Sequence, residues 1–157
     1  MAGAFIGYGA YLACTVGGAC PQLVQSNPGL QKLVFGAFGL PFGLFMTVLS
    51  GTELFTGNAA IVSMAVLENK AQPQQLLKSL SLSWLGNLIG AMTLAKLAIS
   101  SGTMPHGGAT VTLAVAKTSE PFATAFIRGM LCNWLVCMAV YLSSMAKDAT
   151  GKAVAIW

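Results

Sequence analysis

The chain has 157 residues, of which 55% are hydrophobic and 8% charged, and its formal net charge is +4. Soluble domains carry about 25% charged residues, so this composition excludes an ordinary water-soluble domain and predicts an integral membrane protein in a lipid bilayer. The 8 basic and 4 acidic residues are spread thinly and form no basic stripe that could bind nucleic acid.

Uncharged stretches predict the membrane spans, because about 20 helical residues cross the roughly 30 Å hydrocarbon layer. In chain order, we expect a span at 1–18, a loop at 21–29, a second span from 30 that breaks at 51, a half-length helix at 58–67, a connector at 71–75, a third span at 76–100, a fourth from 121 to 145, a turn at 147–152 and the start of a fifth span at 153–157. Residues 101–120 are rich in Gly, Thr and Pro and should loop outside the membrane, although 111–116 could dip back into it.

The segment 51–58 places a carboxylate and two glycines between uncharged apolar runs. Lipid offers no hydrogen bonds to an unwound backbone, so such a break survives only where it lines a cavity or is buried in protein. We therefore predict a broken helix that builds a site around Glu53, with Thr56 and Asn58 capping the helix that follows. The alternative is a water-exposed loop between two spans, but the run 59–67 is too short to cross a bilayer.

Three polar residues, Lys117, Arg128 and Asn133, bracket or enter the fourth span. A lysine at the mouth of a span raises the local concentration of small anions, although Lys117 could equally be a solvated loop residue. Ionisable residues inside a membrane are functional or paired by default, and for Arg128 we favour a structural role. Asn133 has a structural alternative as well, a hydrogen bond between helices.

Glycines recur four residues apart as Gly3 and Gly7 and again as Gly86 and Gly90. Small residues at this spacing let membrane helices cross closely, but a high glycine content alone would also produce such pairs.

No nucleophile-and-base pair, carboxylate pair or phosphate-binding loop can be assembled from the sequence, so we do not expect an enzyme. His106 has no second candidate ligand nearby, and we predict neither a metal site nor a cofactor. The cysteines are expected to be small buried hydrophobic residues, at positions 14, 20, 132 and 137.

Three separated motifs closely resemble the formate/nitrite transporter family in order and spacing: GTELFTGN at 51–58, WLGNLIG at 84–90 and RGMLCNWLVC at 128–137. The resemblance implies an all-α polytopic membrane protein, an aquaporin-like bundle whose second helix is broken by an omega loop, assembled as a homopentamer with one pore per protomer. It also implies that residues 1–157 are a single but incomplete transmembrane domain, which lacks most of helix 5 and helix 6. The family histidine lies downstream of this sequence, and His106 does not match it.

The resemblance assigns residues to two groups. The substrate pathway comprises Leu54, Phe55 and Thr56 at a central constriction, Leu40 and Leu44 at a second narrowing on the cytoplasmic side, and Lys117 in the vestibule. A supporting polar network comprises Glu53, Asn58, Asn87 and Asn133.

These expectations combine into a passive or proton-coupled pathway for small weak-acid anions, most simply formate or nitrite. Apolar constrictions penalise a bare charge, and protonation removes that penalty. The residues leave open the choice among nitrite, formate, hydrosulfide and lactate, and between a plasma membrane and a plastid envelope. Two alternatives remain, a scaffold subunit that transports nothing and an aquaporin-like channel for neutral solutes.

Overall fold

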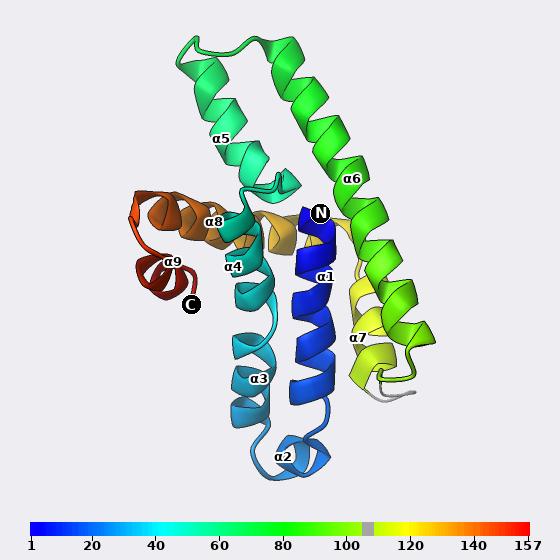
Figure 1. The fold of residues 1–157 in the computed structure, drawn as a ribbon. Helices are drawn as coiled ribbons and strands as arrows, with labels where there is room; N and C mark the ends of the chain where they lie inside the picture. The colour runs from blue at the N-terminus through cyan, green and yellow to red at the C-terminus, as the bar shows by residue number, and fades with distance from the viewer. Residues whose placement is uncertain (105–108) are drawn as a thin grey trace.

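The computed structural model describes residues 1–104 and 109–157, which form helices and no strands (Figure 1). His106 lies outside the described residues. The elements are α1 (Ala2–Leu12), the π-helical η1 (Ala13–Gly17), α2 (Pro21–Ser26), α3 (Pro28–Ala37), α4 (Leu40–Ser50), α5 (Phe55–Leu67), α6 (Pro73–Ser100), α7 (Ala109–Thr118), α8 (Phe122–Met145) and α9 (Ala149–Ile156).

Within the described residues, three helical stretches are long and apolar enough to cross a membrane. They are Pro28–Ser50, which joins α3 and α4 over 23 residues, the 28-residue α6 and the 24-residue α8. The predicted all-α membrane fold is therefore confirmed. The predicted first span is shorter than the length of about 20 residues that a crossing needs, because it consists of 11 α-helical residues followed by 5 in a π-helix.

The predicted second span is not continuous up to its break, because α3 ends at Ala37 and α4 begins at Leu40. Pro41 has no backbone N–H, so the carbonyl of Ala37, four residues earlier, loses its helical partner. The indole Nε1 of Trp157 donates to that carbonyl at 2.9 Å. The Trp157 ring also packs edge-on against Phe45, with the ring centroids 6.1 Å apart. Pro41 was the signal of this interruption in the sequence.

The predicted break after the second span is confirmed. The helix α4 ends at Ser50, and Gly51 follows it in the left-handed conformation with φ of 65°, which glycine adopts without a steric penalty. The helix α5 begins at Phe55 and runs to Leu67. Residues 51–54 thus separate two helices within one apolar segment.

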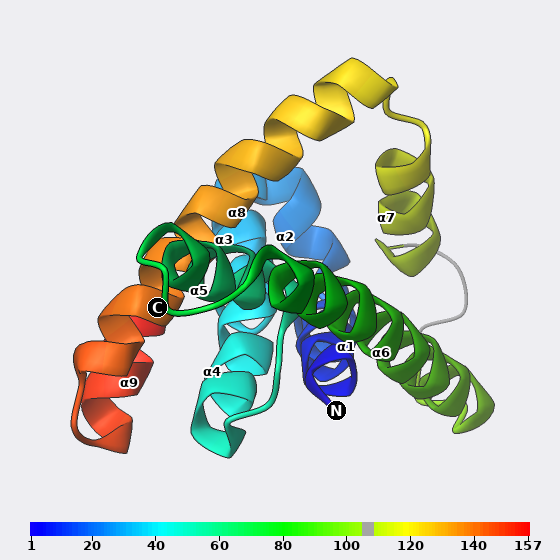
Figure 2. The same cartoon turned by 90° about the horizontal axis from the view of Figure 1, so that it is seen from above.

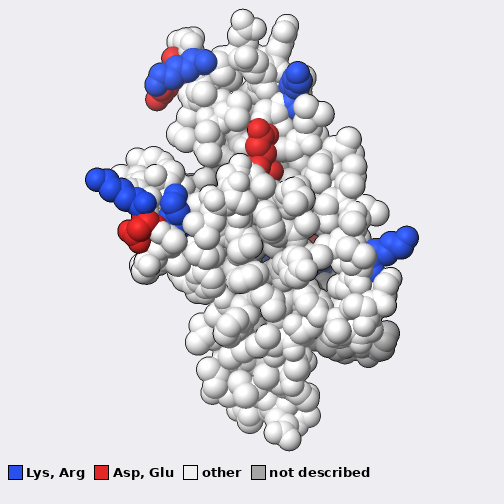
Figure 3. Space-filling view, viewed as in Figure 1, with Lys and Arg blue, Asp and Glu red and all other residues white. Residues whose placement is uncertain are grey.

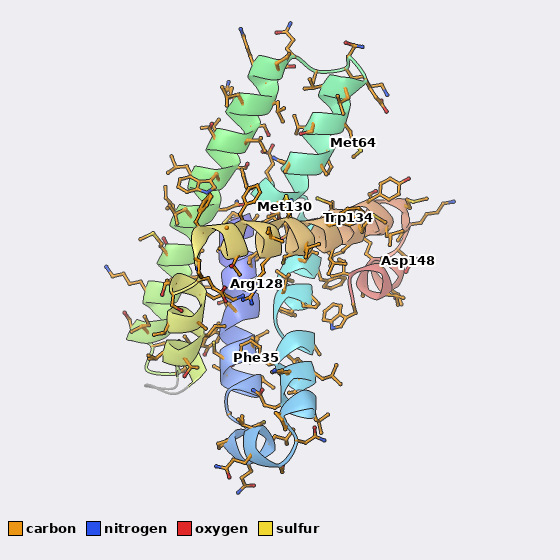
Figure 4. All side chains as sticks on the ribbon, turned by 180° about the vertical axis from the view of Figure 1, so that it is seen from behind. Phe35, Met64, Arg128, Met130, Trp134 and Asp148 are labelled. Atoms are coloured by element: carbon orange, nitrogen blue, oxygen red, sulfur yellow. The ribbon has the colours of Figure 1, made fainter. Side chains whose placement is uncertain are left out.

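The helix α1 packs against both α4 and α6, and α5 and α6 lie side by side (Figures 1 and 2). The long helix α8 crosses α4 steeply, as the view from behind shows (Figure 4). Buried Leu44, Val136 and Ile156, from α4, α8 and α9, form the apolar cluster at this crossing. The N-terminus lies beside the break between α4 and α5 (Figure 1).

Two predicted loops contain helices. The segment 101–120, expected to loop outside the membrane, includes α7. The predicted turn at 147–152 is wrong, because α9 already begins at Ala149. Its cap explains this start: the Oδ1 atom of Asp148 accepts a hydrogen bond from the N–H of Gly151 at 2.9 Å, the interaction that favours Asp before a helix.

Candidate functional site

The break between α4 and α5 is held by a side chain from a distant helix. On α6, the Asn87 Oδ1 atom accepts from the Phe55 N–H at 2.9 Å, and the Asn87 Nδ2 atom donates to the Glu53 carbonyl at 3.1 Å. These bonds satisfy two backbone groups that the interrupted helix leaves without partners. One amide side chain therefore replaces part of the missing helical hydrogen bonding.

The prediction that Thr56 and Asn58 cap α5 is wrong. The N-cap residue is Leu54, which has no side chain able to cap, and Asn87 bonds the first helical N–H instead. The Asn58 Nδ2 atom is engaged elsewhere, at 3.1 Å from the Glu53 Oε2 and 3.0 Å from the Ser79 Oγ. Asn58 thus connects the acidic side chain of the break to α6.

Two cavities share Leu54 as a lining residue. The first, here called the Glu53 cavity, has a volume of about 300 Å³ and is lined by Glu53, Asn58 and Leu54 together with residues of α4, α8 and α9. The second, the Thr56 cavity, measures about 270 Å³ and is lined by Leu54, Phe55 and Thr56 with residues of α1 and α6. Leu54 lines both cavities, so they meet at this residue. Glu53 itself is exposed in the isolated chain, and charged side chains are few and scattered on the face seen in Figure 3.

The other predicted narrowing lies on α4. Leu44 is buried, with 3% of its surface exposed, whereas Leu40 is 43% exposed. Both line a small cavity of about 140 Å³ against α8 and α9, and Leu44 lines the Glu53 cavity as well. The structure therefore brings Leu44 and Leu54 to one cavity and leaves Leu40 outside it.

Lys117 lies in the last turn of α7 and lines an apolar cavity of about 390 Å³ between α1, α6 and α7. Ala91 on α6 lines this cavity and the Thr56 cavity alike, so the two adjoin. Among residues 1–104 and 109–157, the ion pairs are Lys70 with Glu68 and Arg128 with Glu120. Lys117 consequently has no carboxylate partner in that part of the chain, and Glu53 does not contact it there.

Asn133 lies on α8, away from both Lys117 and Asn87. Its Oδ1 atom is buried and has no hydrogen-bond partner among the described residues. It lines a shallow depression with Met130, Trp134 and Cys137. A buried polar atom without a partner is unfavourable. The role of Asn133 in supporting the loop stays a prediction.

Sequence reasoning missed one contact of the site. The Cys137 thiol, expected to be only a small hydrophobic group, donates to the Thr56 carbonyl at 3.6 Å and ties α8 to the first turn of α5. The sequence did contain a signal for this contact. Cys137 lies four residues after Asn133, which was predicted to support the loop, and residues at i and i+4 share one helix face. Arg128, for which a structural role was favoured, pairs with Glu120 just before α8 (Figure 4).

Comparisons with known proteins agree on one family. A family model described as formate/nitrite transporter matches residues 1–157. A probable formate transporter of Methanothermobacter thermautotrophicus is 37% identical over 175 residues, which cover 100% of this chain and 63% of that protein. The chain thus spans less than two thirds of the length of this relative.

Two solved structures are similar over the whole chain. An FNT family ion channel superposes with a TM-score of 0.89 at 34% identity, covering 100% of this chain and 61% of the other. A pentameric formate channel with formate bound superposes with a TM-score of 0.74 at 27% identity, covering 99% and 61%.

Proposed function

Because the chain belongs to the formate/nitrite transporter family, we propose that the protein carrying it is a channel or proton-coupled transporter for formate or nitrite. A similar solved structure is a pentameric formate channel with formate bound, which supports small monovalent anions as substrates and a homopentamer as the assembly. The protein performs no covalent chemistry in this proposal.

The observation that carries the proposal is the interrupted helix at residues 51–54. A break in apolar sequence is stable at membrane depth only if its free backbone groups are bonded by protein or face a cavity. Here both conditions are met, since Asn87 bonds the backbone and two cavities meet at Leu54. A scaffold helix would have no need of such a costly interruption.

The chemistry of the lining suggests how a weak-acid anion would pass. Lys117, a cation with no carboxylate partner among the described residues, raises the concentration of anions at its cavity. Leu54 and Leu44 then present apolar surface, which strongly disfavours a bare charge. A protonated, neutral acid passes this barrier more easily, so the flux should increase as the pH falls.

The test is uptake by liposomes that contain the natural protein carrying this chain. Formate or nitrite uptake should increase as the external pH is lowered, and Lys117→Ala and Thr56→Leu should both reduce it. Lys96→Ala is the matched control, because Lys96 is an exposed lysine on α6 that lines none of the cavities described above.

Three results would contradict the proposal in different ways. Unchanged flux in both Lys117→Ala and Thr56→Leu would refute the assignment of the pathway. Uptake of glycerol or water without anions would indicate a channel for neutral solutes. The absence of any flux from correctly assembled protein would indicate a scaffold subunit.

A further inference from the structure

The two peptide groups that flank Leu54 are both held by Asn87. The Glu53 carbonyl belongs to the peptide before Leu54, and the Phe55 N–H belongs to the peptide after it. The side-chain amide of Asn87 bonds the first at 3.1 Å and the second at 2.9 Å. With both peptide planes fixed, Leu54 keeps an extended backbone, with φ of −105° and ψ of 126°, and its side chain has a defined direction.

Asn87 is itself fixed by close backbone packing of α6 against α1. A Cβ atom added at Gly3 would lie 1.9 Å from the Asn87 carbonyl oxygen, and one added at Gly90 would lie 3.0 Å from the Ala4 nitrogen. Helices packed this closely have little room to shift relative to each other. The position of the Asn87 side chain is therefore set by the crossing of α1 and α6.

From this geometry we propose that Asn87 is a positioning residue that fixes Leu54 where the Glu53 and Thr56 cavities meet and so sets the size limit for the permeating anion. The proposal rests on the proposed function, because the size limit has meaning only if an anion passes Leu54. Without Asn87, both peptides can rotate, and the Leu54 side chain, which lines both cavities, moves away from its place.

The first test measures the break itself by hydrogen–deuterium exchange of peptides covering residues 51–58. Asn87→Leu keeps the approximate size of the side chain and removes both bonds. The loss of two ordinary hydrogen bonds should accelerate exchange there by about 30-fold. Thr93→Val is the matched control, because Thr93 is an exposed polar residue of α6 that bonds only its own helix, at the Ile89 carbonyl.

The second test measures selectivity in liposomes as the ratio of butyrate uptake to formate uptake. Asn87→Leu should increase this ratio by about 5- to 30-fold, while Thr93→Val leaves it unchanged. A merely structural role would reduce both fluxes together and leave their ratio constant. Either an unchanged ratio or unchanged exchange at residues 51–58 would overturn the proposal.

Two further outcomes are distinguishable. If Asn87→Leu does not assemble, Asn87→Asp replaces it. This variant keeps the acceptor for the Phe55 N–H and loses the donor to the Glu53 carbonyl, so exchange at residues 51–58 should rise by about 5-fold. No rise in exchange would overturn the proposal. If the unaltered protein moves no formate, the proposed function fails and the size-limit role fails with it. Accelerated exchange in Asn87→Leu would then still establish that Asn87 holds Leu54.

Discussion

The close approach of α1 and α6 at Gly3 predicts a large effect for one added methyl group. In Gly3→Ala, the new Cβ would lie 1.9 Å from the Asn87 carbonyl oxygen, whereas ordinary van der Waals contact begins at 3.4 Å. The helices α1 and α6 would have to separate by roughly 1.5 Å (3.4 minus 1.9), and inserting a methyl group into a well-packed contact costs about 1–3 kcal/mol. We expect the upper end of this range, because the clash is with backbone atoms.

The assay is thermal unfolding of the purified protein in detergent. For a chain of this size, about 3 kcal/mol corresponds to a decrease in Tm of about 6–12 °C. Uptake of formate should decrease as well, since the displaced Asn87 holds the break at Leu54.

Gly86→Ala is the matched control on α6. No heavy atom lies within 4 Å of a Cβ added there, and alanine is favoured over glycine in a helix by about 1 kcal/mol. Its Tm should therefore stay the same or rise. If Gly3→Ala and Gly86→Ala melted at the same temperature, the close crossing of α1 and α6 described here would be refuted.

Three smaller effects are expected. Trp157→Phe should cost about 1 kcal/mol, because it removes the bond to the Ala37 carbonyl and keeps the ring against Phe45; an unchanged Tm would show that the carbonyl finds another partner. Asp148→Ala should cost about 1 kcal/mol through loss of the α9 cap, and Asp148→Asn should restore it. Arg128→Gln should change stability by less than about 1 kcal/mol because its ion pair is largely exposed on the arginine side, and a larger loss would indicate a buried partner.

The glycine pairs illustrate the limit of sequence reasoning. Gly3, Gly7 and Gly90 do lie where helices approach closely, but a Cβ on Gly86 would meet open space. All four occur at the same spacing of four residues, so spacing alone could not separate them. Only the crossing point of two helices decides which glycine is required, and that point depends on packing between segments more than eighty residues apart.

The predicted site shows the same division. Composition and uncharged runs were enough to predict a helical membrane protein, because the low dielectric of the bilayer forces both apolar surfaces and complete backbone hydrogen bonding. The two glycines and the carboxylate at 51–58 were enough to predict the break, since no packing requirement explains them there. The interruption at Pro41 was missed, although a proline inside a helix always frees the carbonyl four residues earlier.

The partners of the freed backbone groups were not predictable, because they come from elsewhere in the chain. Local capping by Thr56 and Asn58 was the natural expectation, yet Asn87 lies 32 residues beyond Phe55 and Trp157 lies 120 residues beyond Ala37. Sequence patterns report the local cost of an interruption in a helix, which is a property of a few neighbouring residues. The group that offsets this cost is selected by distance in space, and therefore only the tertiary structure could identify it.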